Sequence, residues 1–507
     1  MSPPEASTDP SDRPPAPGDA VQEAGERAAK NTAVRAAGEI IGKLGSLVLF
    51  AVLARQVGDA RLGIFVFALA WAEVAMVPVG LGIDQFLLRQ VAADRTRLDS
   101  FFWNAVYLKL VRGIPVVAGS IALVFLLDYG SETRQTVAII TVAILFETLE
   151  RTLLNTFNAF ERGELVALTI VTQRLVTAAL GLALLFAGFG VVAVALAYLA
   201  GATIRLAMSI YLLSRRLRWP ERVMPRDVRR EIRRRSLTFT AQDIFGLVLA
   251  RADVLILAAL ASDAVVGLYG SAYRLFESTT FINLALSGAF TAMFTYLGRE
   301  STPTLAAVFQ RSIKLLLALQ LPIAVTFGLL AEPLCVAFFG DQFRDSADPL
   351  RLLAPVVVLF GLMVLASILV LSRARPRRMV YTVAFASAVN LILNFVLIPP
   401  YDDVGAALAM LGSLAVYAAI AMWLAVLETG RVNWLSMTGA PVVAAALMAI
   451  PLLLLSGVWP VAVLVAGVVY VGAYTAIERI VEPDDLRFVI DMVKRRLPAG
   501  RRTAETV

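Results

Sequence analysis

Long apolar runs separated by short polar connections dominate the chain from about residue 34 to residue 478. A helix needs roughly 20 mostly apolar residues to cross a bilayer, and the runs are about that long. The pattern therefore predicts about fourteen membrane-spanning helices. They are expected at 34–55, 62–87, 101–127, 135–157, 165–187, 190–213, 237–259, 265–296, 305–330, 346–371, 379–398, 404–427, 437–456 and 459–478.

Three segments lack this apolar pattern. Residues 1–33 are rich in Pro, Ala and acidic residues, and we expect them to be a disordered cytoplasmic N-terminus. Residues 214–236 form a basic linker, which we interpret as a topology anchor lying on anionic headgroups. Residues 481–507 are expected to be a cytoplasmic tail that begins with an interfacial amphipathic helix at 483–497.

Composition agrees with this picture. The hydrophobic fraction is 59%, whereas soluble domains have roughly 45–50% apolar residues. One aqueous core could not hide so much apolar surface. The fold class is therefore an all-α membrane protein, with the bilayer as its solvent.

The basic residues indicate how the helices are oriented. They gather in alternate connections: Arg89, Arg95 and Arg97; Arg162; Arg215 to Arg235; Arg299; Arg373, Arg375, Arg377 and Arg378; Arg431. Arg61 and Arg344 are the exceptions. Cytoplasmic loops carry an excess of Lys and Arg, so both termini are expected in the cytoplasm and the protein in the cytoplasmic (inner) membrane. The net charge of +7 then reflects membrane orientation, and we expect no nucleic-acid partner.

The sequence disfavours several kinds of chemistry. It contains no His, which is the commonest general base and metal ligand. Its one Cys, Cys335, excludes an internal disulfide and a thiolate metal cluster. We therefore expect no catalytic residues, no metal site and no cofactor, and predict that the protein is not an enzyme.

An internal repeat divides the chain. Residues 59–68 and 263–272 share the pattern Asp-Ala-x-x-Gly-aliphatic-aromatic-x-x-Ala, and residues 195–199 echo residues 407–411 more weakly. Chance similarity of Ala-rich strings is the alternative. A true repeat predicts two pseudo-symmetric six-helix lobes, 34–213 and 237–428, facing each other across a central cavity. The last two helices, within 429–480, would form a separate hairpin because only a tight turn joins them.

Several motifs, in their order and spacing, resemble a known family. These are Gly58-Asp-Ala-Arg-Leu-Gly-Ile-Phe, Gly80-Leu-Gly-Ile-Asp-Gln-Phe-Leu-Leu-Arg89, Arg251-Ala-Asp-Val-Leu-Ile-Leu, Gly267-Leu-Tyr-Gly-Ser-Ala-Tyr-Arg274, Phe339-Gly-Asp-Gln-Phe and Leu397-Ile-Pro-Pro-Tyr-Asp-Asp-Val-Gly-Ala-Ala-Leu-Ala. Over about residues 34–430 the chain resembles the polysaccharide (O-antigen type) flippases of the multidrug/oligosaccharidyl-lipid/polysaccharide exporter superfamily. Phe65 and the pair Asp402-Asp403 depart from the family pattern of Tyr and Gly.

Charged residues inside the predicted spans are candidate site residues, because charge is costly in hydrocarbon. The resemblance implies that the first, second, seventh and eighth helices line the central cavity. The candidates for binding substrate are Lys43, Arg112, Arg174, Arg251 and Arg274. The candidates for coupling or ion-pair acids are Glu39, Asp243, Asp253 and Glu277. The alternative is pairing within helices that lowers the cost of burial and binds nothing. Glu147, Glu150 and Arg151 are interpreted as a structural cluster.

Basic groups in a membrane cavity suit a negatively charged lipid-diphosphate glycan, since Arg binds phosphate in a bidentate way. We therefore expect a flippase that moves a lipid-linked oligosaccharide, or a related surface-polysaccharide precursor, by alternating access. Coupling to H⁺ or Na⁺ is left open. Membrane lipids and polysaccharide polymerase or assembly proteins are expected partners, and the protein is expected to be a monomer. The alternatives are a multidrug/cation antiporter of the same superfamily and, from another class, a membrane glycan polymerase or ligase.

Overall fold

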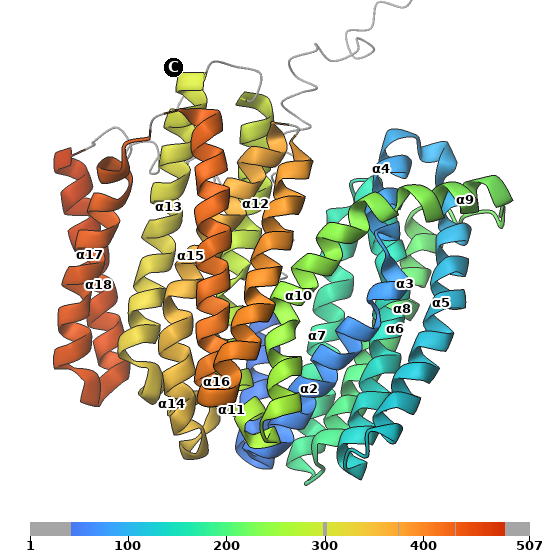
Figure 1. Cartoon of the computed structure of the whole chain (residues 1–507), viewed down its shortest axis with the longest axis horizontal. Helices are drawn as coiled ribbons and strands as arrows, with labels where there is room; N and C mark the ends of the chain where they lie inside the picture. Colours follow the sequence, from blue (N-terminus) through green and yellow to red (C-terminus); the bar gives the residue numbers. More distant parts are fainter. Residues whose placement is uncertain (1–41, 298–301, 374, 431, 482–507) are drawn as a thin grey trace, which may run out of the picture.

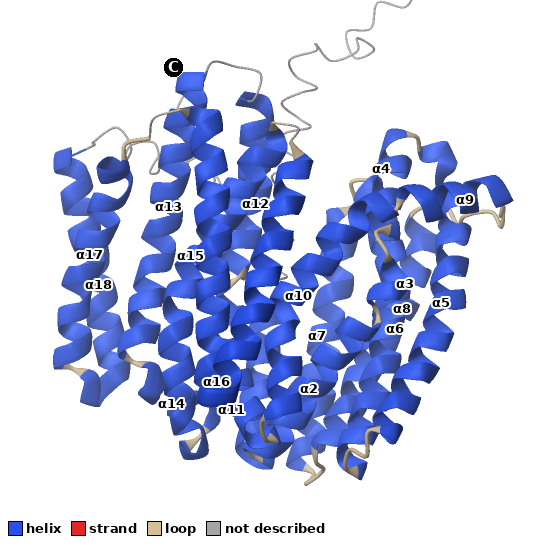
Figure 2. Cartoon of the chain, in the orientation of Figure 1, coloured by secondary structure: helices blue, strands red, loops and turns tan. Residues whose placement is uncertain are grey.

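The computed structural model describes residues 42–297, 302–373, 375–430 and 432–481. The regular elements in these ranges are helices, as Figure 2 shows. Glu39, the expected disordered segment 1–33 and the expected amphipathic helix at 483–497 lie outside the described residues.

The first half of the described chain begins with a helix at residues 42–57. It continues with α2 (Asp59–Ala75), α3 (Val77–Gly80), α4 (Ile83–Ala93), η2 (Arg95–Arg97), α5 (Leu98–Leu126), α6 (Ser131–Ala159), α7 (Gly163–Phe186), α8 (Val191–Arg216) and α9 (Arg226–Arg235). The second half holds α10 (Leu237–Leu260), α11 (Asp263–Thr279), α12 (Phe281–Leu297), α13 (Thr302–Leu329), α14 (Ala331–Phe339), η3 (Asp341–Ser346), α15 (Ala347–Ser372), α16 (Pro376–Thr429), α17 (Trp434–Leu454), η4 (Ser456–Val458) and α18 (Trp459–Val481).

Nine segments of the described chain are long and apolar enough to cross a membrane. One of them, α16, holds two successive helices. The protein is therefore a multi-pass membrane protein. Other long helices, such as α6 and α10, carry several charged residues within their length. The expected number of fourteen spans stays a prediction.

The helices form two bundles (Figure 1). The first bundle consists of α3 to α8, with α9 lying across one end, and the second bundle consists of α11 to α16. Helix α2 packs against α6 of the first bundle and α11 of the second, while α10 packs against α16. The hairpin α17–α18 packs on α13 at the far side of the second bundle. The division into lobes at 34–213 and 237–428 remains our interpretation of this arrangement.

The second expected span, 62–87, is not one continuous helix. The chain breaks after α2 at Met76 and again at Leu81 and Gly82, both of which have positive φ angles (37° and 67°). Pro78 lies in the first turn of α3 and lacks the amide hydrogen that a continuous helix would need there. Gly82 adopts the left-handed conformation without a steric cost. A broken helix of this kind is tolerated in membranes where protein or a cavity surrounds it.

Helix α16 folds back on itself at Asp402, where φ is 48°. The amide nitrogen of Asn390, before the turn, donates a hydrogen bond to the Ser413 hydroxyl after it at 3.0 Å. Gly405 makes the reversal tight, because a Cβ there would lie 2.1 Å from the carbonyl oxygen of Leu397. The two helices expected at 379–398 and 404–427 therefore form an antiparallel pair.

The two copies of the repeat pack directly against each other. A Cβ on Gly63 would lie 1.8 Å from the carbonyl oxygen of Asp263, and a Cβ on Gly267 would lie 2.0 Å from the carbonyl oxygen of Asp59. Because each glycine lacks a side chain, the backbone of the first residue of the other copy can pack directly against it. Small residues allow membrane helices to approach this closely. We call this reciprocal contact between α2 and α11 the glycine seal.

Hydrogen bonds beside the glycine seal join the first described helix to α14 and η3. The guanidinium group of Arg55 donates to the carbonyl oxygens of Ala337 and Phe338, and the side-chain amide of Gln342 donates to the carbonyl oxygen of Ala54 at 2.9 Å. This end of the molecule is therefore closed by backbone contacts and hydrogen bonds between the two halves of the chain.

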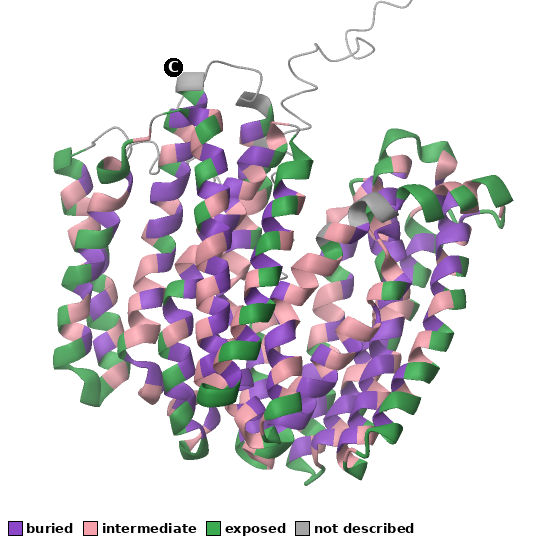
Figure 3. Cartoon of the chain, in the orientation of Figure 1, coloured by how far each residue is buried: buried purple, intermediate pink, exposed green. Residues whose placement is uncertain are grey.

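Side chains on the outside of the bundles are largely apolar. Figure 3 shows exposed positions along α17 and α18, where Leu464 and Val468 are 72% and 75% exposed. Lipid tails are the solvent for such a surface. A buried ion pair at 2.7 Å between Lys314 of α13 and Glu478 of α18 fastens the hairpin to the second bundle.

Replacing Gly63 with Ala should destabilise the protein, because the added methyl group overlaps the Asp263 carbonyl. We expect the free energy of unfolding to fall by about 1–3 kcal/mol, the usual cost of overpacking. Unfolding in detergent micelles measures the change.

Gly467→Ala is the matched control, because nothing lies within 4 Å of a Cβ at this position in α18. Equal stability of the Gly63→Ala and Gly467→Ala variants would contradict the close backbone packing that defines the glycine seal.

Candidate functional site

A cavity of about 310 Å³ lies between the two bundles. The helix at 42–57, α2, α6, α7, α8, α10 and α11 all contribute to its walls. Among the described residues, its charged lining consists of five cations and three carboxylates: Lys43, Arg174, Arg205, Arg251 and Arg274, with Glu73, Glu147 and Glu277. The described lining therefore has a net positive charge.

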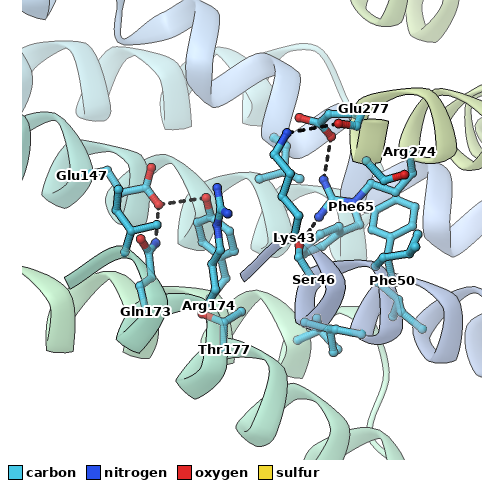
Figure 4. Close-up of a pocket in the computed structure, with 18 of the residues that line it drawn as sticks. Lys43, Ser46, Phe50, Phe65, Glu147, Gln173, Arg174, Thr177, Arg274 and Glu277 are labelled. Carbon is cyan, nitrogen blue, oxygen red and sulfur yellow. Dashed lines mark hydrogen bonds and ion pairs between the residues drawn. The ribbon is translucent and has the colours of Figure 1, made fainter. Parts of the chain in front are cut away.

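One side of the cavity is an ion-pair network around Glu277 (Figure 4). Arg274 donates to the Glu277 carboxylate at 2.7 Å, and the Lys43 ammonium donates to the Glu277 carbonyl oxygen at 3.1 Å. Arg274 also donates to the Ser46 hydroxyl and Lys43 to Thr280. The network joins the helix at 42–57 to α11, which lie far apart in the sequence.

Arg251 of α10 extends this network to α2. Its guanidinium group binds both carboxylate oxygens of Glu73, one of them at 3.3 Å, and lies 4.0 Å from the Glu277 carboxylate. The planar guanidinium suits such two-point contacts. Arg251 and Arg274 thus share the carboxylates of Glu73 and Glu277, while Lys43 binds the carbonyl oxygen of Glu277.

The opposite side belongs to the first bundle. The Glu147 carboxylate accepts hydrogen bonds from the Gln173 amide and, at 2.9 Å, from the Tyr198 hydroxyl. Arg205 donates to the Gln173 oxygen at 2.6 Å and pairs with the buried Glu150 at 2.9 Å. Amide and hydroxyl groups here alternate with charge, an arrangement that can bind both anions and hydroxyl groups.

Apolar groups complete the lining. Phe50 and Phe65 line the cavity beside the network around Glu277, and the Arg274 guanidinium lies 5.0 Å from the Phe50 ring centre. Such packing strengthens electrostatic interactions, because it lowers the local dielectric constant. Among the described residues, no group of three or more His, Cys, Asp or Glu side chains is arranged to hold a metal ion.

The structure gathers several of the residues expected from the sequence. Lys43, Arg174, Arg251, Arg274 and Glu277 all line the cavity. They come from four separate helices: the helix at 42–57, α7, α10 and α11. Their role in binding stays a prediction.

The other expected residues lie elsewhere. Asp253 is fully buried away from the cavity and accepts a hydrogen bond from Tyr269. It follows Arg251 by two positions, which places the two side chains on roughly opposite sides of α10. Asp243 is exposed, and Asp84 and Arg151 are the charged groups near it. Arg112 is half-buried beside α9.

Other lining residues escaped prediction. Glu73, Gln173 and Tyr198 line the cavity, as does Glu147, which the sequence placed in a structural cluster. Glu73 lies within the expected span 62–87. Because a charged residue inside a span is costly, its position alone could have marked it as a candidate site residue. Gln173 and Tyr198 are uncharged, and their helical positions alone carry no such signal.

Lys109 and Asp84 form a separate buried pair at 2.6 Å, outside the cavity lining. The Lys109 ammonium also donates to the Thr148 carbonyl oxygen at 2.6 Å and the Thr152 hydroxyl at 2.8 Å. Its three donors are therefore satisfied within the first bundle, and the pair joins α4 and α5 to α6.

Comparisons with known proteins agree with this architecture. The chain is 23% identical over 367 residues to the "Probable low-salt glycan biosynthesis flippase Agl15" of Haloferax volcanii, covering 72% of this chain and 76% of that protein. Its fold is similar to that of the lipid II flippase MurJ in an inward closed conformation, with a TM-score of 0.74, 12% identity and coverage of 88% of this chain and 98% of MurJ.

A multidrug resistance MATE family transporter of the MOP superfamily, in an inward-facing conformation, shares the fold with a TM-score of 0.63. The identity is 17%, and the match covers 78% of this chain and 98% of the transporter.

The family model described as "Polysaccharide biosynthesis protein" matches residues 28–300, more than half of the chain. This range includes the first bundle, the glycine seal and both sides of the cavity. The chain therefore belongs to the polysaccharide biosynthesis protein family.

Proposed function

We propose that this protein is a flippase that carries a lipid-diphosphate-linked oligosaccharide, or a related surface-polysaccharide precursor, across the cytoplasmic membrane by alternating access. The observation that carries the proposal is the net positive cavity between two bundles of a multi-pass membrane protein. Membership of the polysaccharide biosynthesis protein family supports it, as does the similarity to a glycan biosynthesis flippase.

The charges suit the polar part of such a substrate. A diphosphate that leaves water needs cations and hydrogen-bond donors in place of its hydration shell. Lys43, Arg251 and Arg274 supply these donors on one wall, and they exchange their present hydrogen-bond and ion-pair partners for phosphate oxygens. Gln173 and Tyr198 on the other wall face the sugar hydroxyl groups. The lipid tail stays in the bilayer while the headgroup passes through the cavity.

Because one end of the molecule is closed, we infer that the structure represents a state whose cavity is accessible from the cytoplasm. The glycine seal closes one end of the bundles, whereas the arginines of α9 lie at the other end. The positive-inside rule places the arginine-rich end in the cytoplasm, with both termini on that side. Export would require the seal to open and the arginine-rich end to close.

The antiporter alternative shares the fold but fits the cavity less well. A site for cationic drugs should be acidic, and the described lining has more cations than carboxylates. A polymerase or ligase would need a large outer catalytic loop. The longest outer connection between described helices, 330–346, is folded into α14 and η3.

We propose that no covalent chemistry and no cofactor are involved, and that the protein acts as a monomer. Coupling to H⁺ or Na⁺ is part of the same hypothesis, with Glu277, Asp253, Asp243 and Glu39 as its candidate acids. Polymerase or assembly proteins that use the exported precursor are the expected partners.

Deleting the gene should trap lipid-linked glycan on the cytoplasmic side of the membrane, because the headgroup cannot cross unaided. Extraction of the lipid-linked pool and labelling of surface glycan measure this. Normal surface polysaccharide in a clean deletion strain without a second flippase would contradict the proposal, and efflux of a cationic drug by the purified protein in vesicles would favour the antiporter.

Removing charge from the cavity should stop transport while the fold survives. Arg251→Gln alone leaves Glu73 unpaired, so the double variant Arg251→Gln/Glu73→Gln is the informative one, because it removes both charges together. We expect it to fold normally and to lose transport by about tenfold or more, the effect of one hydrogen bond to a charged group.

The matched control is Arg351→Gln, which removes an exposed arginine paired with Asp348 on α15. It should leave surface glycan unchanged. Full transport by the double variant would show that Arg251 does not contact the substrate.

A further inference from the structure

The first described helix is tied to the second half of the chain at two levels by its own cations. Near its beginning, the Lys43 ammonium donates to the Glu277 carbonyl oxygen at 3.1 Å. Near its end, the Arg55 guanidinium donates to the carbonyl oxygens of Ala337 and Phe338, the latter at 3.0 Å. Twelve positions of helix separate the two cations, or about 18 Å at 1.5 Å per residue. Lys43 lines the cavity, whereas Arg55 is exposed and lies outside its described lining.

The contact of Arg55 caps the carboxyl end of α14. Ala337 and Phe338 belong to the last turn of this helix, which ends at Phe339, and Gly340 turns the chain away with a φ angle of 101°. The last carbonyl oxygens of a helix have no partner within it. They also carry a partial negative charge, which a cation stabilises. The positive charge of Arg55 is therefore part of the contact, in addition to its hydrogen bonds.

A second hydrogen bond runs in the opposite direction. The side-chain amide of Gln342, which follows α14, donates at 2.9 Å to the carbonyl oxygen of Ala54, close to the end of the first described helix. The carboxyl ends of two helices thus lie near each other, and each receives a donor from the opposite half of the chain. Two such ends repel each other because both are partly negative, and the guanidinium of Arg55 offsets this repulsion. We call the hydrogen bonds of Arg55 and Gln342 the outer contact.

Other exposed ion pairs at this end of the molecule stay within one half of the chain. Arg61 of α2 pairs with Glu132 of α6 at 3.3 Å, and Arg344 of η3 pairs with Glu332 of α14. Figure 1 shows α14 at the end of the molecule opposite α9. Arg55 differs from Arg61 and Arg344 because its contact crosses between the halves beside the glycine seal. Its loss would therefore weaken the closed end without disturbing either bundle.

We propose that the outer contact is a latch, in which Arg55 sets how readily the glycine seal opens. The inference rests on the proposed function, because it assumes alternating access. A phosphate in the cavity would take Lys43 from the carboxyl end of α11 and so release one of the two ties. The tie at Arg55 lies beyond the reach of a cavity ligand and holds until the seal itself opens. Arg55 is thus a positioning residue that touches no substrate.

Distances between spin labels on the two bundles test the latch in the full-length protein without substrate. Ser131→Cys in α6 and Asp348→Cys in α15 place the labels at exposed positions of the closed end, in a Cys335→Ala background. Pulsed electron paramagnetic resonance in lipid nanodiscs then measures the ratio of open to closed molecules. We expect Arg55→Gln to raise this ratio about fivefold, within the net effect of one hydrogen bond.

The charge of Arg55 gives a second readout. Salt screens interactions between exposed charges, so high salt should raise the open fraction of the wild type. It should do the same in Arg55→Lys, which keeps the charge and should lie closer to the wild type than Arg55→Gln does. Arg55→Gln should lose this salt dependence, because the cation that salt screens is gone. A residue that only fills space would not change the response to salt.

Arg344→Gln is the matched control, because it removes an exposed arginine at the same end whose ion pairs lie within the second half. It should leave the label distances unchanged. If Arg55→Gln does not fold, Gln342→Ala decides, because the Gln342 side chain is exposed and its loss breaks the other hydrogen bond of the outer contact.

Two results would overturn the proposal. Label distances and salt dependence that are the same in Arg55→Gln and the wild type would exclude the latch. Equal opening by Arg344→Gln would reduce it to a general effect of positive charge at this end. The label distances are independent of the transport assay, so a protein that opens as expected and moves no lipid-linked glycan would support the latch and contradict the proposed function.

Discussion

The pairing of charged side chains between helices is the interaction on which this structure depends. Water is scarce inside a bilayer protein, so each guanidinium and carboxylate there must find a partner of opposite charge or a polar group. Arg251 forms an ion pair with Glu73, and Arg274 forms one with Glu277. The first of these pairs links α10 to α2 along one side of the cavity, so the same contacts hold the helices together and contribute to the charge of the cavity.

The network around Glu277 and the glycine seal lie on the same helices, which relates binding to movement. Helix α11 carries Gly267 near its beginning and Glu277 near its end, and α2 carries Gly63 and Glu73 in the corresponding places. A phosphate that displaced the carboxylates would loosen the cations that join these helices. Because Gly63 and Gly267 lie on these same two helices, α2 and α11 would then also be less constrained at the glycine seal.

Much of this architecture could be predicted from the sequence, because apolar length and charge alternation follow directly from bilayer thickness and orientation. The repeat also indicated which two helices correspond. The direction of a side chain within a helix was harder to predict: Arg251 and Asp253 lie two positions apart yet face different surroundings. The break at Leu81 depends on neighbouring helices that accept an interrupted backbone, and the uncharged Gln173 and Tyr198 become site residues only through their tertiary position.

The reciprocal packing of Gly63 and Gly267 has a consequence for the sequence of the chain. Each glycine is fitted to the backbone of the other copy, so a larger residue in one half cannot be tolerated by adjusting a side chain in the other. The two halves therefore constrain each other's sequence at this point. The glycine shared by residues 59–68 and 263–272 therefore has a packing reason in each half.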